Sequence, residues 1–326
     1  MIESLEDRKL MASTFRITSI SADNRGEVVL QMNQAVNAST VSASSVLLYT
    51  AGADGKLGTS DDVRQHFAVT YDSSTEKITL RGRLDLTRLP DTGYRVRVLS
   101  TKLLSAAGQE LDGEFKGSSV ASGNGRSGGD CNFRVEAPSG NPEVRISTSE
   151  GTMTVQLYLN KVKTTVQNFL RYANDALYDN TIYHRSVPSF VIQAGGYSAK
   201  DDSTGLPAEI QQFSPIALQA LLSNTRGTVA MARTSNPNSA TSQFFFNTVD
   251  NSANLNANAS TGNNGYAVFG AITSSSGLAT MDKIARLPTE DLTPSTSGTA
   301  FETVPDDSGA LVVIRRIAVV DKIVAI

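Results

Sequence analysis

The sequence contains no tryptophan, one cysteine (Cys131) and only two histidines, His66 and His184. A single cysteine excludes an intrachain disulfide and any metal site built from several cysteines. The two histidines lie far apart in the sequence, which excludes a histidine-rich metal centre. A Ser/His/Asp triad would have to use one of these two residues. These absences leave few ways to build a metal centre or a nucleophilic triad.

Strong charge and long apolar runs are absent as well. The formal net charge of the 326-residue chain is −3, which gives no reason to expect nucleic acid or an anionic membrane as a partner. No apolar run approaches the roughly 18 residues of a transmembrane helix, and residues 1–13 lack the apolar centre of a secretory signal. Hydrophobic residues make up 40% of the chain, enough for a globular core, and the length suits two ordinary domains.

Residues 1–13 form a charged tail. Within it, Ser4–Ala12 (SLEDRKLMA) is similar to a short motif near the start of many large exported or surface proteins of bacteria. The motif, the scarcity of cysteine and the Ser/Thr/Asn-rich loops predict an exported or cell-envelope protein. A frayed N-terminal tail on a cytoplasmic protein is the alternative.

Residues 14–137 predict an antiparallel β-sandwich. Short apolar or alternating segments are separated by turn sequences such as Asp23–Gly26 and Pro90–Gly93, and no helical stretch of convincing length interrupts them. The pattern resembles bacterial Ig-like domains, with the Gly/Ser-rich loop Gly117–Asp130 before the last strand. This loop as the interdomain linker is the alternative. Strands are expected at Phe15–Ile20, Glu27–Met32, Val46–Tyr49, Val63–Tyr71, Lys77–Leu80, Tyr94–Leu99 and Cys131–Val135.

The one candidate ion site in this half is the loop that holds Asp54, Asp61 and Asp62. Carboxylates on a glycine-rich backbone suit calcium, but the spacing is not that of an EF-hand. A long solvated hairpin loop is the alternative. Elsewhere we expect no metal, and we expect no cofactor.

Residues 138–142 are expected to be a linker, and residues 143–326 a second domain. Many short strands with two helices, at Lys161–Asn174 and Gly277–Ala285, predict a closed antiparallel β-barrel capped by helices. We expect strands at Val144–Ser149, Thr152–Tyr158, Ile182–Arg185, Phe190–Gln193, Thr228–Ala232, Gln243–Asn247, Ala267–Ala271 and Leu311–Val319, with an exposed insertion at Pro288–Ser308.

Three segments of this half carry most of the functional information: Thr181–Gly196 (TIYHRSVPSFVIQAGG), Gly227–Thr248 and Gly265–Ile272. The first places one cation, Arg185, among aromatic, aliphatic and glycine residues, with no carboxylate close to it in sequence. A guanidinium in such surroundings is a permanently charged donor that needs an acceptor. In order and spacing, the three segments resemble the cyclophilin family of peptidyl-prolyl isomerases, bacterial members above all, from about Val144 to Val319.

The resemblance implies a role for individual residues. Arg185 matches the catalytic arginine of the family, and Gln193 matches the side chain that holds the substrate backbone with it. Phe190, Phe245 and Leu255 match the apolar walls of the proline pocket, and Val191 stands where the family often has methionine. The remaining substrate-binding matches are Ala232, Arg233, Gln243 and Tyr266. Ordinary barrel core is the alternative for the apolar residues and the better one for Phe244 and Phe246, while His184 is expected to be structural.

The resemblance implies an isomerase that rotates Xaa–Pro peptide bonds and assists the folding of proline-containing or unfolded clients. Asn254 stands where many members have tryptophan, so we expect weak cyclosporin binding. The alternative is a catalytically weak module that binds proline-containing segments and is anchored by the Ig-like domain. A third hypothesis is calcium-dependent adhesion through the loop of Asp54 to Asp62.

Overall fold

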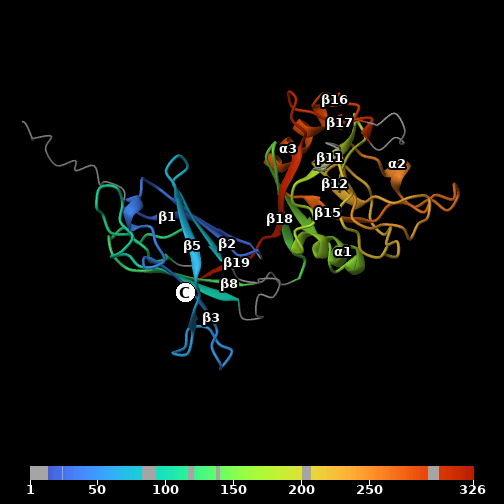
Figure 1. The fold of residues 1–326 in the computed structure, drawn as a ribbon. Coiled ribbons are helices and arrows are strands. Elements are labelled where there is room, and N and C mark those ends of the chain that lie inside the picture. Colours follow the sequence, from blue (N-terminus) through green and yellow to red (C-terminus); the bar gives the residue numbers. More distant parts are fainter. Residues whose placement is uncertain are drawn as a thin grey trace, which may run out of the picture. The chain divides into compact units, whose positions relative to one another are not determined.

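The chain forms two compact units that are mainly β (Figure 1). The first unit runs to Ala137 and resumes at Asp321–Ile326, and the second unit is Pro138–Val320. The computed structural model describes residues 14–23, 25–82, 93–116, 121–136, 140–199, 207–292 and 301–326. The expected N-terminal tail and part of the expected linker 138–142 lie outside the described residues.

Two antiparallel sheets make up the first unit, with strand orders β1-β2-β6-β5 and β19-β8-β7-β3-β4. Along β2 and β8 every second residue is buried, as the period of two of a strand requires. The elements are β1 (Ile17–Ala22), β2 (Glu27–Met32), η1 (Ala38–Thr40), β3 (Val46–Thr50), β4 (Val63–Arg64), β5 (Phe67–Asp72), β6 (Lys77–Gly82), β7 (Tyr94–Val98), β8 (Cys131–Glu136) and β19 (Lys322–Ala325).

One buried cluster joins the two sheets. It contains Leu30 and Ile78 from the first sheet together with Val96 and Phe133 from the second. The first unit is therefore a sandwich, and its Ig-like character stays a prediction. The single strand expected at Val63–Tyr71 is wrong, because β4 pairs with β3 in one sheet whereas β5 pairs with β6 in the other.

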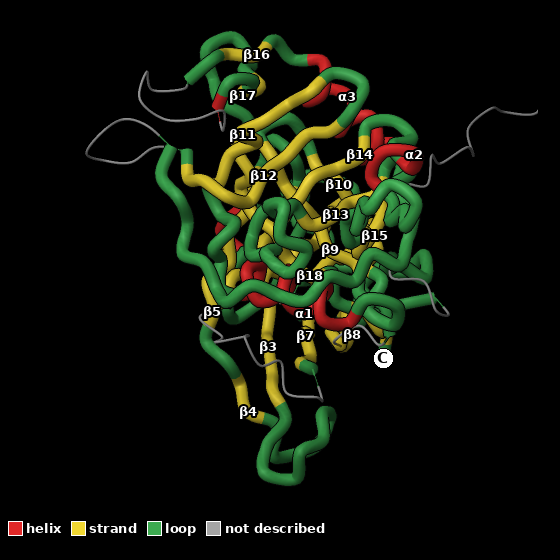
Figure 2. The backbone as a smooth tube through the Cα atoms, turned by 90° about the vertical axis from the view of Figure 1, so that its right-hand side faces the viewer, coloured by secondary structure: helices red, strands yellow, loops and turns green. Residues whose placement is uncertain are grey.

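The candidate calcium site is not supported. The loop between β3 and β4 extends away from the sheets (Figure 2), and no group of three or more His, Cys, Asp or Glu in the described ranges could hold a metal ion. Asp54 and Asp61 accept hydrogen bonds from Lys56 and Asp54 main-chain N–H groups, at 2.8 and 3.0 Å. Asp62 lies 3.2 Å from Arg95 in an ion pair. These carboxylates fold the hairpin loop itself.

The Gly/Ser-rich loop belongs to the first unit. In its described part, the Ser122 N–H donates to the Ile17 carbonyl at 2.9 Å, and the Gly128 N–H donates to the Leu111 carbonyl at 3.0 Å. The alternative of an interdomain linker is thereby wrong for this part of the loop.

The end of the chain differs from the expected domain boundary. Residues Lys322 to Ala325 pair with Glu136 to Phe133 of β8, so the last strand completes a sheet of the first unit. The sequence prediction had placed these residues in the second domain. The second unit is thus inserted between two neighbouring strands of the first.

A closed barrel of strand order β10-β15-β13-β14-β12-β11-β18-β9 forms the second unit, as predicted. Its strands are β9 (Glu143–Thr148), β10 (Thr152–Leu157), β11 (Thr181–Val187), β12 (Val191–Ser198), β13 (Thr228–Met231), β14 (Phe244–Asn247), β15 (Val268–Ile272) and β18 (Val313–Val319). The small pair β16 (Thr289–Glu290) and β17 (Val304–Pro305) lies outside the barrel.

Helices α1 (Lys163–Asn174) and α3 (Ser275–Arg286) occupy the two predicted helical segments, and the four-residue α2 (Ser252–Leu255) was not predicted. The α3 helix begins at Ser274, whose hydroxyl accepts from the Gly277 N–H at 3.0 Å. No helix in the described ranges combines the length and the apolar character needed to cross a membrane.

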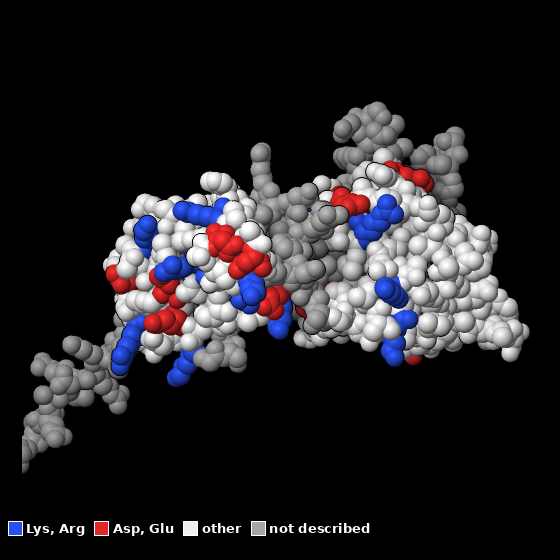
Figure 3. All heavy atoms as spheres, turned by 90° about the horizontal axis from the view of Figure 1, so that it is seen from below, with Lys and Arg blue, Asp and Glu red and all other residues white. Residues whose placement is uncertain are grey.

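Charged side chains on the face shown in Figure 3 are of both signs and interspersed on the first unit, while the second unit shows few. No continuous basic surface is visible on this face, in line with the net charge of −3.

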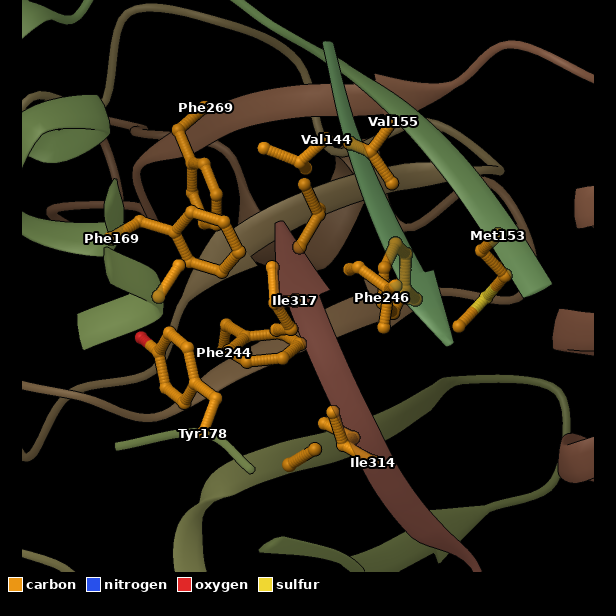
Figure 4. Packing of buried hydrophobic residues seen from close by; sticks show 14 of the residues in the cluster. Val144, Met153, Val155, Phe169, Tyr178, Phe244, Phe246, Phe269, Ile314 and Ile317 are labelled. Atoms are coloured by element: carbon orange, nitrogen blue, oxygen red, sulfur yellow. The ribbon is translucent and has the colours of Figure 1, made fainter. Parts of the chain in front are cut away.

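Aromatic and aliphatic side chains fill the barrel (Figure 4). Phe169 of α1 packs edge-on against Phe244 of β14, with ring centroids 5.4 Å apart, and lies 4.9 Å from the ring of Phe269. Met281 and Ile284 bring α3 into the same core. The barrel interior is packed, so a binding site has to lie on its outside.

The segment Pro288–Ser308 is not simply an exposed insertion. Val304 is fully buried, and the Ser186 N–H donates to the Thr303 carbonyl at 2.8 Å. The Phe301 ring packs edge-on against Tyr197, with centroids 4.7 Å apart. The described end of this segment therefore supports β11 beside Arg185.

Candidate functional site

Nine of the ten residues that the resemblance selects surround one cavity of about 180 Å³ on the barrel wall. A space of this volume suits a single side chain and not a large cofactor. The lining residues are Arg185, Phe190, Val191, Gln193, Ala232, Arg233, Phe245, Leu255 and Tyr266.

Strand register explains how residues far apart in sequence come to share this wall. Arg185 of β11 pairs with Gln193 of β12, and Gln193 pairs in turn with Phe245 of β14. Phe245 also pairs with Ala230 of β13. Because directly paired residues point to the same face of a sheet, these side chains form one row across four strands.

The period of two also separates the three phenylalanines of β14. Phe244 and Phe246 point into the barrel and are fully buried in its core, as predicted. Phe245 points the other way, into a second cluster with Val191 and Leu255. One FFF sequence therefore supplies both barrel core and cavity wall.

Arg185 is half-buried at the cavity. Within the described ranges its guanidinium forms no ion pair with a carboxylate. A charged fork partly removed from water, without a protein counter-charge, interacts strongly with an acceptor that enters the cavity.

Gln193 is held beside Arg185 by a second amide. The Gln193 Nε2 group donates to Gln243 Oε1 at 2.8 Å. Gly196 makes this arrangement possible, because a Cβ at that position would lie 2.7 Å from the Gln243 amide nitrogen. The amide of Gln193 is therefore fixed in orientation at the edge of the cavity.

His184 lies behind this pair and is 2% exposed. Burial lowers the pKa of its imidazole to about 4, the nearby charge of Arg185 acts in the same direction, and a hydrogen bond to Gln243 opposes both. The imidazole is therefore neutral at pH 7 and cannot serve as a cationic acid there. The structural role expected from the sequence agrees with this environment.

Arg233 closes another side of the cavity. Its Nε and Nη2 groups donate to the Gly265 carbonyl at 3.0 and 2.9 Å, and its Nη1 group donates to the Thr234 carbonyl at 2.8 Å. The guanidinium lies over the Tyr266 ring, 4.4 Å from its centroid. Tyr266 in turn packs edge-on against Phe245, with centroids 5.6 Å apart. These contacts fix the arginine and the two rings as one rigid wall.

Gln243, the tenth predicted residue, lines a neighbouring cavity of about 400 Å³. Gln193, Ala232 and Arg233 line both cavities, so the two are adjacent. The second cavity is more polar, with Gln212, Ser239 and Thr241 among its lining residues. An extended chain could place one side chain in each cavity.

Leu255, the least clear match in the sequence, lines the cavity from α2. Asn254 precedes it and is exposed. Sequence reasoning missed three buried asparagines behind the same wall, Asn224, Asn247 and Asn251. Of the three, only Asn251 falls in the asparagine-rich stretch 250–264, and that composition is also typical of exposed loops.

Comparison with known proteins gives a family for the second unit. Residues 143–303 match the family model described as cyclophilin type peptidyl-prolyl cis-trans isomerase/CLD. A peptidyl-prolyl cis-trans isomerase of Acinetobacter baylyi is 43% identical over 151 residues, 46% of this chain and 74% of that protein. Peptidyl-prolyl cis-trans isomerase B of Escherichia coli is 38% identical over 148 residues, 45% of this chain and 85% of that protein.

A solved structure also matches part of this chain. It is a Cryptosporidium parvum cyclophilin type peptidyl-prolyl cis-trans isomerase, crystallised in the presence of the dipeptide Ala-Pro. It is 24% identical, covers 54% of this chain and 98% of its own, and gives a TM-score of 0.41.

Proposed function

Because the chain belongs to the cyclophilin family of peptidyl-prolyl cis-trans isomerases, we propose that its cavity binds a proline ring and that Arg185 catalyses rotation about the preceding peptide bond. The observation that carries this proposal is the row of Arg185, Gln193 and Phe245 across neighbouring strands. It puts a cation, an amide and an aromatic wall beside one space sized for a single side chain.

The reaction requires no nucleophile and no proton abstraction. Rotation is slow, tens to hundreds of seconds unassisted, because the C–N bond has partial double-bond character and a barrier of about 18–20 kcal/mol. In the twisted state conjugation is lost, and the prolyl nitrogen becomes pyramidal with a localised lone pair. A donor aimed at that nitrogen stabilises the twisted state over both planar states, which is differential binding of the transition state.

Each part of the site has a separate task in this proposal. Phe245, Leu255 and Tyr266 enclose the ring, and Gln193 holds the backbone of the client beside it. Arg185 donates to the prolyl nitrogen. An acceleration of about 10⁵-fold asks for about 7 kcal/mol, within reach of one charged donor in a partly dehydrated site combined with fixed geometry.

The test is cis–trans exchange of a short peptide containing Ala-Pro-Phe, measured for the wild type and for Arg185→Ala at matched folded concentration. We expect strong acceleration by the wild type and a loss of about 10²- to 10³-fold in kcat in the variant. Arg226→Ala is the matched control, because it removes an exposed arginine that pairs with Asp282 at 2.8 Å. Cyclosporin added to the same assay is expected to inhibit weakly, since Asn254 replaces an aromatic residue of the family.

A folded wild type that binds the peptide without accelerating exchange would instead support the second candidate function, a module that only binds proline-containing segments. Exposed Asn254 beside the pocket is the one observation that favours it. Proline-containing or unfolded chains are the clients proposed in either case. An exported or cell-envelope location is proposed from the N-terminal motif, the scarcity of cysteine and the Ser/Thr/Asn-rich loops, and cell fractionation would test it.

A further inference from the structure

Behind the proline cavity lie three buried asparagines, Asn224, Asn247 and Asn251, whose exposed fractions are 0%, 0% and 3%. Asn224 lies in the loop before β13, Asn247 ends β14, and Asn251 precedes α2 as its N-cap residue. None of the three lines the cavity. Burying a primary amide is costly unless its hydrogen bonds are satisfied, so these side chains need an explanation.

The three amides form one directional chain of hydrogen bonds. Asn251 Nδ2 donates to Asn247 Oδ1 at 2.8 Å, and Asn247 Nδ2 donates to Asn224 Oδ1 at 3.2 Å. Asn247 Nδ2 also donates to Thr228 Oγ1 of β13 at 2.9 Å. Each link uses the acceptor of one amide and a donor of the next. Aspartate or threonine could not replace a middle member, because neither combines two N–H donors with an amide oxygen.

At both ends of this hydrogen-bond chain, an asparagine amide donates to main-chain carbonyls of residues that line the cavity. Asn251 Nδ2 donates to the Phe190 carbonyl at 2.8 Å. At the other end, Asn224 Nδ2 donates to the Leu255 carbonyl at 3.1 Å and lies 3.4 Å from the Tyr266 carbonyl. Phe190, Leu255 and Tyr266 all line the cavity.

These three residues belong to separate connecting segments. Phe190 is the last residue of the turn between β11 and β12, Leu255 ends α2, and Tyr266 precedes β15. The Tyr266 N–H donates to the Leu255 carbonyl at 3.0 Å, which joins two of the three residues directly. The buried chain of amides links this pair to Phe190. Asn251 serves this chain instead of its helix, since its side chain makes no capping hydrogen bond to α2.

We propose that Asn224, Asn247 and Asn251 are positioning residues that set the width of the proline pocket through Phe190, Leu255 and Tyr266. This inference rests on the proposed function. The walls touch the ring in the planar and the twisted states alike, so their displacement weakens both complexes to a similar extent. Breaking the chain therefore raises KM more than it lowers kcat, whereas Arg185→Ala acts mainly on kcat.

The experiment compares Asn247→Ala, Asn251→Ala and the double variant in the peptide exchange assay at matched folded concentration. We expect kcat/KM to fall about tenfold in each, mostly through KM. Because both residues act through one chain, the double variant should lose little more than Asn247→Ala alone, and not the product of the two losses.

Thr165→Val is the matched control, because it removes from helix α1 one part-buried hydrogen bond, which the buried Thr165 hydroxyl donates to Gln219 at 2.9 Å. It should lower stability and leave KM unchanged. Asparagine variants that keep the wild-type KM, or that change it no more than Thr165→Val, would overturn the proposal, as would fully multiplicative losses.

If Asn247→Ala does not fold, Asn251→Ala and Asn251→Ser carry the same test from the end of the chain next to Phe190. If the wild type does not accelerate exchange, the proposed function fails. The positioning role is then tested by calorimetry, which compares the affinity of the wild type and of the Asn251 variants for Ala-Pro-Phe. Unchanged affinity in the variants would overturn the positioning role.

Discussion

Two guanidinium groups, those of Arg185 and Arg233, line the cavity, and neither has a carboxylate partner in the described ranges. Arg185 is aimed at the reaction in the proposed mechanism. The hydrogen bonds of Arg233 go to neutral carbonyls, which leave its positive charge uncompensated. The site therefore carries local positive charge on a chain whose net charge is −3.

This charge predicts a preference among clients. A peptide with Glu directly before proline should have a kcat/KM about threefold higher than its Lys counterpart, as expected for a partly exposed ion pair. Arg233→Gln should remove the preference, measured as the ratio of the Glu to the Lys rate so that a loss of wall contacts, which affects both peptides, cancels. Since the interaction is exposed to water, 0.5 M salt should weaken it. Equal rates for the Glu and Lys peptides at low salt would contradict this prediction.

The residues around the cavity were predictable to very different extents. Arg185, Phe190 and Gln193 fall in one continuous segment, Thr181–Gly196. Its resemblance to a known family was enough to identify them. Asn224 and Asn247 are 23 residues apart and meet only through side-chain hydrogen bonds. Such bonds follow neither the period of a strand nor that of a helix, and so leave no pattern in the sequence.

At the scale of elements, the strands and helices with clear periods were predicted well. Strand β2 (Glu27–Met32) has the predicted bounds, and α1 (Lys163–Asn174) begins two residues after the predicted start. Strand β19 (Lys322–Ala325) was missed, because its apolar residues continue the pattern of β18 and its partner β8 lies almost two hundred residues earlier. Local pattern cannot reveal a pairing at that separation.

Deletion of residues 322–326 tests the role of β19. The first unit should lose roughly 2 to 4 kcal/mol of unfolding free energy, since the deletion removes a run of strand hydrogen bonds and exposes β8. Ile323, which packs against the sandwich core, is lost as well. Isomerase activity should be unchanged at a temperature where both units are folded. Differential scanning calorimetry provides the measurement, with Lys322→Ala as the control. An unchanged unfolding transition of the first unit would show that β19 does not stabilise it.

At the scale of the whole molecule, two buried titratable groups give the units opposite responses to pH. Burial, reinforced by the charge of Asp23, raises the pKa of Asp321 in the first unit from 3.8 to about 7. Burial lowers the pKa of His184 in the second unit from 6.5 to about 4. Between pH 7 and 5 the Asp321 carboxyl becomes protonated in the folded first unit, whereas it stays ionised in the unfolded form. In the same range His184 stays unprotonated in the folded second unit, whereas it binds a proton in the unfolded form.

Acidification from pH 7 to 5 should therefore stabilise the first unit and destabilise the second, each by roughly 2 kcal/mol from these groups. Thermal unfolding of the wild type, Asp321→Asn and His184→Gln across this range provides the test. Asp321→Asn should remove the gain of the first unit, and His184→Gln should remove the loss of the second. Parallel pH profiles for wild type and variants would show that these groups do not control the response.

The insertion of the barrel between β8 and β19 also fixes an order of events during synthesis. Strand β8 leaves the ribosome before the barrel, and its partner β19 leaves after the whole of Pro138–Val320. At about 5–20 residues per second, this interval lasts roughly 10 to 40 s. Throughout it the nascent sandwich presents β8 as an unpaired edge, the kind of strand that recruits other chains. Because β18 ends at Val319 and β19 begins at Lys322, the barrel and the sandwich that surrounds it in sequence receive their last strands almost together.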